Sequence, residues 1–202
     1  MAVKNHALDD RLVEAARAEF LEKGFRGASL SRITQRAGLT TGALYTRYKN
    51  KDALFCSLVQ EVLELAGRHM AGMYQAYSEA QASGDPRQLL NVIRQEESLY
   101  LDMLVEHKEA CVLLFCRSDG SSLETHLKEM MDRKAEQTEA YFKSIAKPGA
   151  EVEGLGFIIS SQFHFFRQIL EKNYEVDKTL RCMKTVTRYM EAGWTALFEE
   201  IL

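Results

Sequence analysis

The chain has 202 residues, of which 46% are hydrophobic and 27% are charged. This composition is ordinary for a soluble globular protein, and the chain is long enough to bury a core without disulfide or metal support. The net charge of −3 gives no overall attraction to nucleic acid, so a site for a polyanion has to come from local clustering of basic residues.

Cysteine usage and the first residues of the chain bear on metal sites and location. The four cysteines include no CxxC pair, which argues against a metal site and favours small buried side chains. Residues 1–10 are polar and acidic, and no stretch approaches the length of a membrane span. We therefore expect a cytoplasmic protein with reduced thiols, no metal, no cofactor and no membrane contact.

The first predicted helix covers roughly residues 6–23. Its apolar side chains recur every four residues, the spacing of one helix face; they are Leu8, Leu12, Ala16 and Phe20. Asp9 and Asp10 fall in its first turn, where negative charge is favourable, and Gly24 is placed to end it.

Two shorter helices follow and are predicted to form a helix-turn-helix. Ser29 is suited to cap the first of them, and Gly38 ends it as a left-handed residue would. Leu39 is expected to fill the space between the helices. Thr40 is suited to cap the second helix, which is expected to run to about Tyr48. A short helix, a tight turn and another short helix are the elements of a DNA-reading unit.

Basic residues gather in the same region. The segment from Lys23 to Lys51 holds seven of them and no Asp or Glu; they are Lys23, Arg26, Arg32, Arg36, Arg47, Lys49 and Lys51. An acid-free basic patch on a slightly acidic protein is typical of a surface that binds a polyanion. The alternative is an ordinary solvated surface, which the complete absence of acids disfavours.

The second short helix is predicted to read bases. At about 100° per residue, Leu44 faces inward, whereas Gly42, Ala43 and Thr46 face outward. Such small exposed residues let a helix approach base edges in a major groove.

Flanking residues are predicted to hold phosphates or guanine. Tyr45 offers a hydroxyl and Arg47 a guanidinium on either side of the outward face. Asn50 is suited to cap the next helix, and the N-terminus of that helix with Lys51 is expected to bind a phosphate.

The stretch from Ala37 to Leu54 resembles the signature of the TetR family of bacterial regulators; it reads AGLTTGALYTRYKNKDAL. The pattern upstream matches as well, so the resemblance covers about residues 8–60. It implies phosphate contacts for Thr40, Tyr45 and Lys51, and base contacts for the outward face. Thr34 and Thr41 depart from the residues usual in the family, and Thr41 leaves the operator sequence open. The expected DNA-binding residues are Ser29, Arg32, Thr40, Thr41, Gly42, Ala43, Tyr45, Thr46, Arg47 and Lys51.

The expected fold is all-α, with about nine helices. Residues 1–50 are predicted to form the helix-turn-helix DNA-binding domain, and residues 51–202 an effector-binding and dimerisation domain. Turn signals divide the body into helices, with Ser121 and Glu124 as a capping box and Asp177 as a cap. The last two helices are expected at about 152–172 and 178–201.

Those last two helices are apolar on more than one face and must be buried on more than one face. The family resemblance implies that they pair with a second copy, and readers of this kind need two half-sites about one DNA turn apart. The alternative is that they only cover the monomer core. The expected dimer contacts are Leu155, Ile158, Ile159, Gln162, Phe166, Tyr189, Met190, Trp194 and Leu197.

A pocket for a small organic effector is also implied by the resemblance. Aromatic residues, methionine and few charges suit an amphipathic ligand, although plain core is the favoured interpretation for each candidate taken alone. The candidates are Tyr100, Met103, His107, Phe115, Tyr141, Phe163, His164 and Phe166.

The resulting function is a ligand-responsive transcriptional regulator, a repressor that an effector releases from double-stranded operator DNA. A small helical enzyme is the first alternative. It is disfavoured because the sequence has no HExxH, GxSxG or phosphate-loop motif and its five histidines show no partnered spacing, so no catalytic residue is expected. The second alternative is a protein-interaction module whose helix-turn-helix no longer binds DNA.

Overall fold

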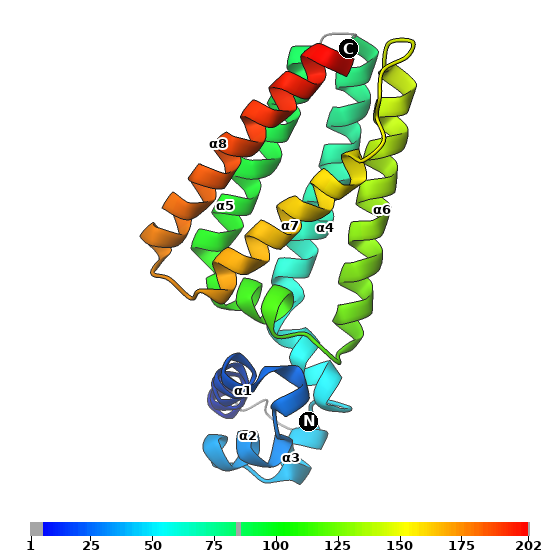
Figure 1. The fold of residues 1–202 in the computed structure, drawn as a ribbon. Coiled ribbons are helices and arrows are strands. Elements are labelled where there is room, and N and C mark those ends of the chain that lie inside the picture. Colours follow the sequence, from blue (N-terminus) through cyan, green and yellow to red (C-terminus); the bar gives the residue numbers. More distant parts are fainter. Residues whose placement is uncertain (1–5, 84–85, 202) are drawn as a thin grey trace. The chain divides into compact units, whose positions relative to one another are not determined.

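The computed structural model describes residues 6–83 and 86–201, and each regular element there is a helix (Figure 1). In chain order these are α1 (His6–Gly27), α2 (Leu30–Ala37), α3 (Thr41–Tyr45), α4 (Lys51–Ser83), α5 (Pro86–Cys116), α6 (Ser122–Ile145), α7 (Leu155–Glu171) and α8 (Val176–Ile201). Non-helical backbone at His107 divides α5 into two segments. The predicted all-α fold is confirmed.

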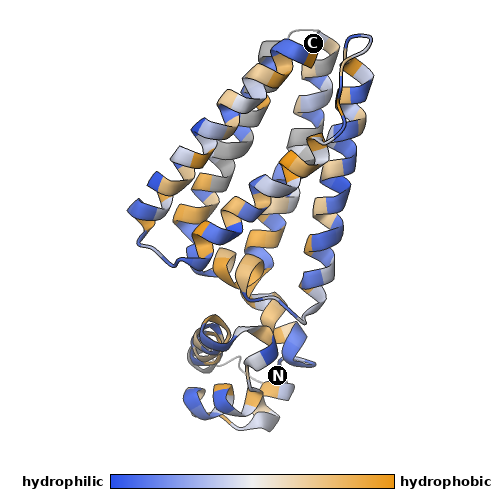
Figure 2. Cartoon of the chain, viewed as in Figure 1, coloured by the Kyte–Doolittle hydropathy of each residue, from blue (hydrophilic) through white to orange (hydrophobic). Residues whose placement is uncertain are grey.

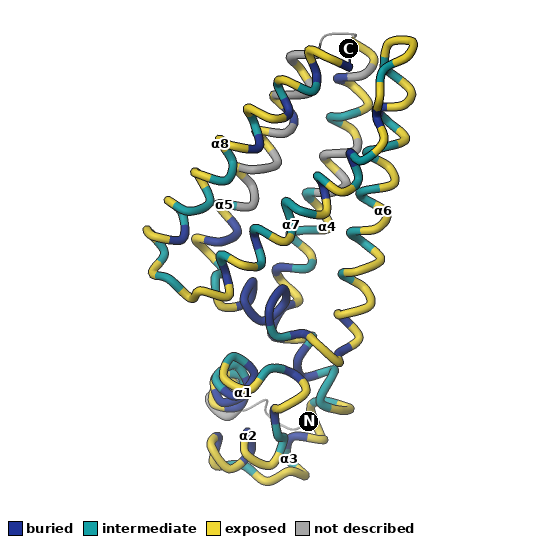
Figure 3. Tube along the Cα trace, viewed as in Figure 1, coloured by how far each residue is buried: buried dark blue, intermediate teal, exposed yellow. Residues whose placement is uncertain are grey.

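The chain forms two compact units. The first comprises Met1–Leu63 and Glu109–His126, and the second Glu64–Lys108 and Leu127–Leu202. The first unit therefore contains the predicted head, the beginning of α4, the end of α5 and the loop that leads into α6. Figure 3 shows the end of α5 as an almost wholly buried segment, because residues 111–116 are apolar throughout.

Three phenylalanine rings form the centre of the first unit. Phe20 of α1 and Phe55 of α4 are fully buried, with their ring centroids 5.0 Å apart and edge to face. Phe25 completes the group at 5.3 Å from Phe55. Edge-to-face pairs add to the stability that burial of the rings provides. The start of α4 is thus part of the same core as α1.

The backbone of Gly24 lets Phe25 reach that core. Gly24 has a φ of +67°, a left-handed conformation that side chains other than glycine rarely adopt. It kinks α1 after the regular stretch, which agrees with the predicted end near residue 23. The amide of Phe25 then donates to the carbonyl oxygen of Arg117 at 2.8 Å, which joins the kink to the loop after α5.

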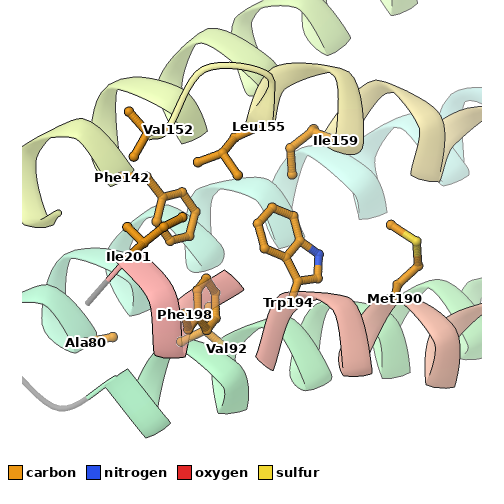
Figure 4. Packing of buried hydrophobic residues seen from close by; sticks show 10 residues of the cluster. All are labelled: Ala80, Val92, Phe142, Val152, Leu155, Ile159, Met190, Trp194, Phe198 and Ile201. Atoms are coloured by element: carbon orange, nitrogen blue, oxygen red, sulfur yellow. The ribbon is translucent and has the colours of Figure 1, made fainter. Parts of the chain in front are cut away.

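The second unit is built around a separate aromatic cluster (Figure 4). The ring of Phe142 from α6 stacks on Trp194 and Phe198 of α8 at 5.7 Å and 5.2 Å. Leu155 and Ile159 of α7 pack against them. Figure 2 shows hydrophobic and hydrophilic residues alternating along α8, as expected of a helix that buries one face.

Two predicted helix starts differ from the structure. α8 begins at Val176, so Asp177 lies inside the first turn, where its charge still suits the helix dipole. The capping box of α6 is modified: the Ser121 hydroxyl accepts from the Leu123 amide, but the Glu124 carboxylate accepts from the amide of Gly120 rather than Ser121. None of the described helices is both long and apolar enough to span a bilayer.

Replacement of Phe55 by alanine tests the first core. Phe55→Ala is expected to lower the free energy of unfolding by about 3–5 kcal/mol, because it removes a fully buried ring and leaves a cavity. Urea denaturation followed by circular dichroism measures the loss. The control is Val105→Ala, which removes a side chain that is half exposed and should change stability by less than about 0.5 kcal/mol. Equal stability of the two variants contradicts this account.

Candidate DNA-binding site

The helix-turn-helix is held by three local caps. The Ser29 hydroxyl accepts from the Arg32 amide, and the Thr40 hydroxyl accepts from the Ala43 amide at 3.1 Å. Between them Gly38 adopts φ +66°, and its amide donates to the Gln35 carbonyl. The Leu39 amide donates to the Thr34 carbonyl at 2.9 Å, so the turn is a Schellman motif. These bonds fix the directions of α2 and α3, as the sequence predicted.

The third helix is shorter than expected. α3 ends at Tyr45 instead of about Tyr48, because the amides of Arg47 and Tyr48 both turn back to the Leu44 carbonyl. The chain then enters the cap of α4, where the Asn50 side chain accepts from the Ala53 amide at 2.8 Å. A single turn and a half of helix therefore presents the reading face.

The outward face of α3 is small and exposed. Leu44 is fully buried, whereas Thr41, Gly42 and Thr46 are exposed and Ala43 is half-buried. Tyr45 is 54% exposed, an unusual degree for a large aromatic side chain. No acidic residue lies on α3, so nothing on this helix repels a phosphate. Such a surface can lie close to base edges.

Arg47 is turned away from the reading face. Its Nε forms a short ion pair with the Asp9 carboxylate of α1, and its Nη1 donates to the Ala43 carbonyl at 2.9 Å. The side chain is only 28% exposed. Arg47 thus ties the end of the reading segment to α1, and a contact with DNA requires it to exchange Asp9 for a phosphate or a base.

Arg32 is engaged by a buried carboxylate. Glu19 accepts from Nε of Arg32 at 2.7 Å and from the Ser29 amide at 3.0 Å. Burial alone raises the pKa of Glu19, but the hydrogen bonds from Arg32 and from the Ser29 amide outweigh it, and the pKa lies below its ordinary value. This pair fastens α2 to α1 and offsets the charge of Arg32.

Lys51 does not present its amino group as the predicted phosphate clamp. Its Nζ donates to the carbonyl oxygens of Phe25 at 2.7 Å, Ala28 at 3.2 Å and Arg26 at 3.4 Å. It also lies 4.5 Å from the centroid of the Phe25 ring. The carbonyls that end α1 lack partners within the helix, and an ammonium group with three donors satisfies them. Lys51 therefore has a structural role here.

Most charges of the basic segment are paired. Lys23 lies against Glu22 and Arg26 against Glu124, in addition to the pairs of Arg32 and Arg47. Within the part of the chain that the structure describes, Arg36 and Lys49 are the two exposed cations of this segment without an ion pair. Neither was among the predicted site residues. Arg36 and Lys49 therefore supply the positive charge of this segment that is available to a polyanion.

The predicted effector residues separate into groups. Met103, His107, Tyr141, Phe163 and Phe166 belong to the second unit. Phe115 belongs to the first unit, where it is buried at the end of α5. His164 is exposed on α7, where its ring contacts the Gln168 amide. The side chain of Tyr100 lies outside the described residues.

Several predicted dimer residues are already buried within one chain. These are Leu155, Ile159, Phe166, Met190 and Trp194. Each of them is at most 8% exposed, so little of its side chain is left to meet a partner. Ile158, Gln162 and Leu197 are half-buried, and Tyr189 is 72% exposed. Phe157, which was not predicted, is 82% exposed on α7.

Comparisons of the sequence with known proteins concern the N-terminal region. The family described as "Bacterial regulatory proteins, tetR family" matches residues 12–58. The HTH-type transcriptional regulator YdgC of Bacillus subtilis is 37% identical over 51 residues, which are 25% of this chain and 26% of that protein. The HTH-type transcriptional repressor Rv1474c of Mycobacterium tuberculosis is 35% identical over 54 residues, 27% of this chain and 29% of that protein. The chain thus spans between a quarter and a third of the length of these relatives.

Comparison of the structure covers nearly the whole chain. A TetR-like transcriptional regulator from Rhodococcus sp. RHA1 has a TM-score of 0.57 at 19% identity, over 95% of this chain and 100% of that one. NalD, the secondary repressor of the MexAB-OprM multidrug efflux pump in Pseudomonas aeruginosa, has a TM-score of 0.56 at 18% identity, over 96% of both chains. At these identities the likeness concerns the fold.

The role of Lys51 can be separated from DNA contact by comparison with its neighbour. Lys51→Met is expected to lower the free energy of unfolding by roughly 2 kcal/mol, because it leaves the carbonyls at the end of α1 without their charged donor. Lys49→Met, two residues away and exposed, should leave stability unchanged. Urea denaturation measures both. If the two variants unfold at the same urea concentration, the structural role of Lys51 is wrong.

Proposed function

Because residues 12–58 of this chain match the tetR family of bacterial regulatory proteins, we propose that the protein is a ligand-responsive DNA-binding transcriptional regulator. It acts as a repressor that a small organic effector releases from double-stranded operator DNA. The observation that carries the proposal is the exposed, acid-free face of α3, held at both ends by caps within the region that the family matches.

The residues divide into base-reading and phosphate-binding sets. Thr41, Gly42, Ala43 and Thr46 lie against base edges in the major groove, where small side chains allow close approach. Phosphates are held by the hydroxyls of Tyr45, Thr40 and Ser29 and by the unpaired cations Arg36 and Lys49. Arg32 and Arg47 join them only by exchanging Glu19 and Asp9 for a phosphate. The N-terminus of α4 offers backbone amides beside Lys51.

Residues 1–50 are the DNA-binding domain, and residues 51–202 bind the effector and a second copy of the chain. A homodimer places two reading heads on half-sites about one DNA turn apart. Its interface uses α7 and α8 through Phe157, Tyr189, Ile158, Gln162 and Leu197. Two large, highly exposed aromatic side chains on these helices support that assignment, because such residues are enriched where proteins associate.

The effector acts through a difference in affinity for two states of the dimer. If it binds more tightly to the state whose heads do not fit the half-sites, it lowers operator affinity by the same factor. The relatives YdgC and Rv1474c are named as a transcriptional regulator and a transcriptional repressor, which supports a protein that regulates rather than catalyses. A cytoplasmic location follows from access to DNA.

Selection of bound sequences from random double-stranded DNA tests the reading function. A single enriched two-fold symmetric sequence is expected, with affinity that falls steeply as salt rises. Arg36→Ala and Lys49→Ala should each weaken binding to all sequences and reduce the salt slope by about one, because each removes a phosphate contact. Arg133→Ala, which removes an equal charge from the second unit, is the control. Failure to enrich any sequence contradicts the proposal.

The dimer interface makes a separate prediction. Phe157→Asp and Tyr189→Asp are expected to weaken self-association at least tenfold, because each places a charge in an apolar contact. Analytical ultracentrifugation measures the association, and operator affinity should fall in parallel. Val105→Asp changes another exposed apolar residue outside these helices and should have no effect. A dimer that withstands both α7 and α8 variants rules out this interface.

A further inference from the structure

Two arginines of the helix-turn-helix are paired with acids of α1, and the two pairs differ in how deeply the acid is buried. The side chain of Glu19, which pairs with Arg32, is 7% exposed. The side chain of Asp9, which pairs with Arg47, is 32% exposed. Removing the cation from a buried pair leaves a carboxylate without compensation, whereas a partly exposed carboxylate regains water. The two arginines therefore differ in how easily a competing anion can draw them away.

The buried pair also holds the start of α2 in place. The Glu19 carboxylate accepts from Nε and Nη2 of Arg32 at 2.7 Å and 2.6 Å, and from the Ser29 amide at 3.0 Å. Nη2 of Arg32 donates in addition to the Gly27 carbonyl at 2.8 Å. A phosphate that drew Arg32 away would break these bonds together and leave Glu19 with the Ser29 amide alone. The pair therefore joins the end of α1 to the first turn of α2.

Arg47 lies at the edge of the exposed face of α3. Its Nη1 donates to the Ala43 carbonyl at 2.9 Å and to the Thr46 hydroxyl at 3.5 Å, and Thr46 is one of the residues expected to meet base edges. Its Nε holds Asp9, which lies in the first turn of α1. A phosphate that approaches Thr46 therefore arrives beside the guanidinium group and competes with Asp9 for it.

We propose that Asp9 is an internal competitor of DNA, which holds Arg47 in the free protein and releases it to a backbone phosphate when the exposed face of α3 enters the major groove. Glu19, in contrast, keeps Arg32 in both states and so positions α2. The inference rests on the proposed function, because it concerns how affinity is set at the same surface. Asp9 lowers the affinity for DNA by the free energy of breaking its own ion pair, which for a partly exposed pair corresponds to roughly threefold.

Neutralising the acids of α1 one at a time separates this arrangement from a general effect of charge. General electrostatics predicts that every such change strengthens DNA binding by a similar small factor, because each adds one positive charge to the same unit. We expect instead that Asp9→Asn strengthens binding roughly threefold and that Glu19→Gln does not strengthen it. The matched control is Asp10→Asn, which changes the exposed neighbour of Asp9 and should alter affinity by less than about 1.5-fold, because salt screens exposed charges.

Stability distinguishes the two acids as well. Glu19→Gln should lower the urea concentration at the midpoint of unfolding, because the amide cannot offset the charge of Arg32. Asp9→Asn should leave that midpoint nearly unchanged, because a partly exposed ion pair contributes little to stability. Both are measured by circular dichroism on the full-length protein.

The salt dependence of binding identifies the arginine that meets a phosphate. The probe is the duplex that the full-length protein enriches from random DNA, labelled with fluorescein and followed by fluorescence anisotropy. Arg47→Gln should reduce the slope of log affinity against log salt by about one, and Arg32→Gln should leave that slope as it is in the parent protein. In the Arg47→Gln protein, Asp9→Asn should have no further effect on affinity, because the two residues act as one pair.

Three results overturn the inference. They are equal strengthening of binding by Asp9→Asn and Asp10→Asn, strengthening by Asp9→Asn that persists in the Arg47→Gln protein, and a slope that falls with Arg32→Gln but not with Arg47→Gln. Each of them leaves the regulatory function standing, because the parent protein still binds its duplex. A parent protein that enriches no duplex contradicts the regulatory function and this inference together.

Discussion

The first unit depends on one ammonium group placed where α1 ends and α4 begins. Lys51 donates to the carbonyls of Phe25, Arg26 and Ala28, which the helix itself leaves without partners. At the same junction Phe55 packs on Phe20 and Phe25. Because α2 and α3 lie between these two points in the chain, both ends of the reading segment are fixed. A rigid frame of this kind lets a short helix hold its face in one orientation.

Local chemistry was predictable from the sequence, and long-range pairing was not. Ser29, Thr40 and Asn50 each act on the residue three positions further along the chain, so their side-chain types alone indicated the caps. The absence of Asp and Glu between Lys23 and Lys51 was also visible in the sequence. However, the acids that pair with Arg32 and Arg47 come from α1, and nothing in the segment itself points to Glu19 or Asp9. Lys51 donates to backbone carbonyls more than twenty residues earlier in the chain, a contact that its own position in the sequence does not indicate.

The second unit shows a different limit of sequence reasoning. Periodicity indicated that α7 and α8 are apolar on more than one face, but it did not say which face meets the chain's own core. Leu155, Met190 and Trp194 face the core, whereas Phe157 and Tyr189 face away from it. Polar groups deep in this unit are equally hidden from the sequence.

The discontinuity of the first unit has a consequence for exchanging parts between relatives. Residues 109–126 belong to this unit, and they are joined to it by backbone and side-chain bonds. Arg117 accepts from the Phe25 amide and donates to the Leu21 carbonyl, while the Ser122 amide and hydroxyl donate to Asp52. A chimera that grafts only the contiguous N-terminal segment onto another body loses these contacts. A transplanted DNA-binding unit must therefore include two separate stretches of the chain, residues 1–63 and 109–126.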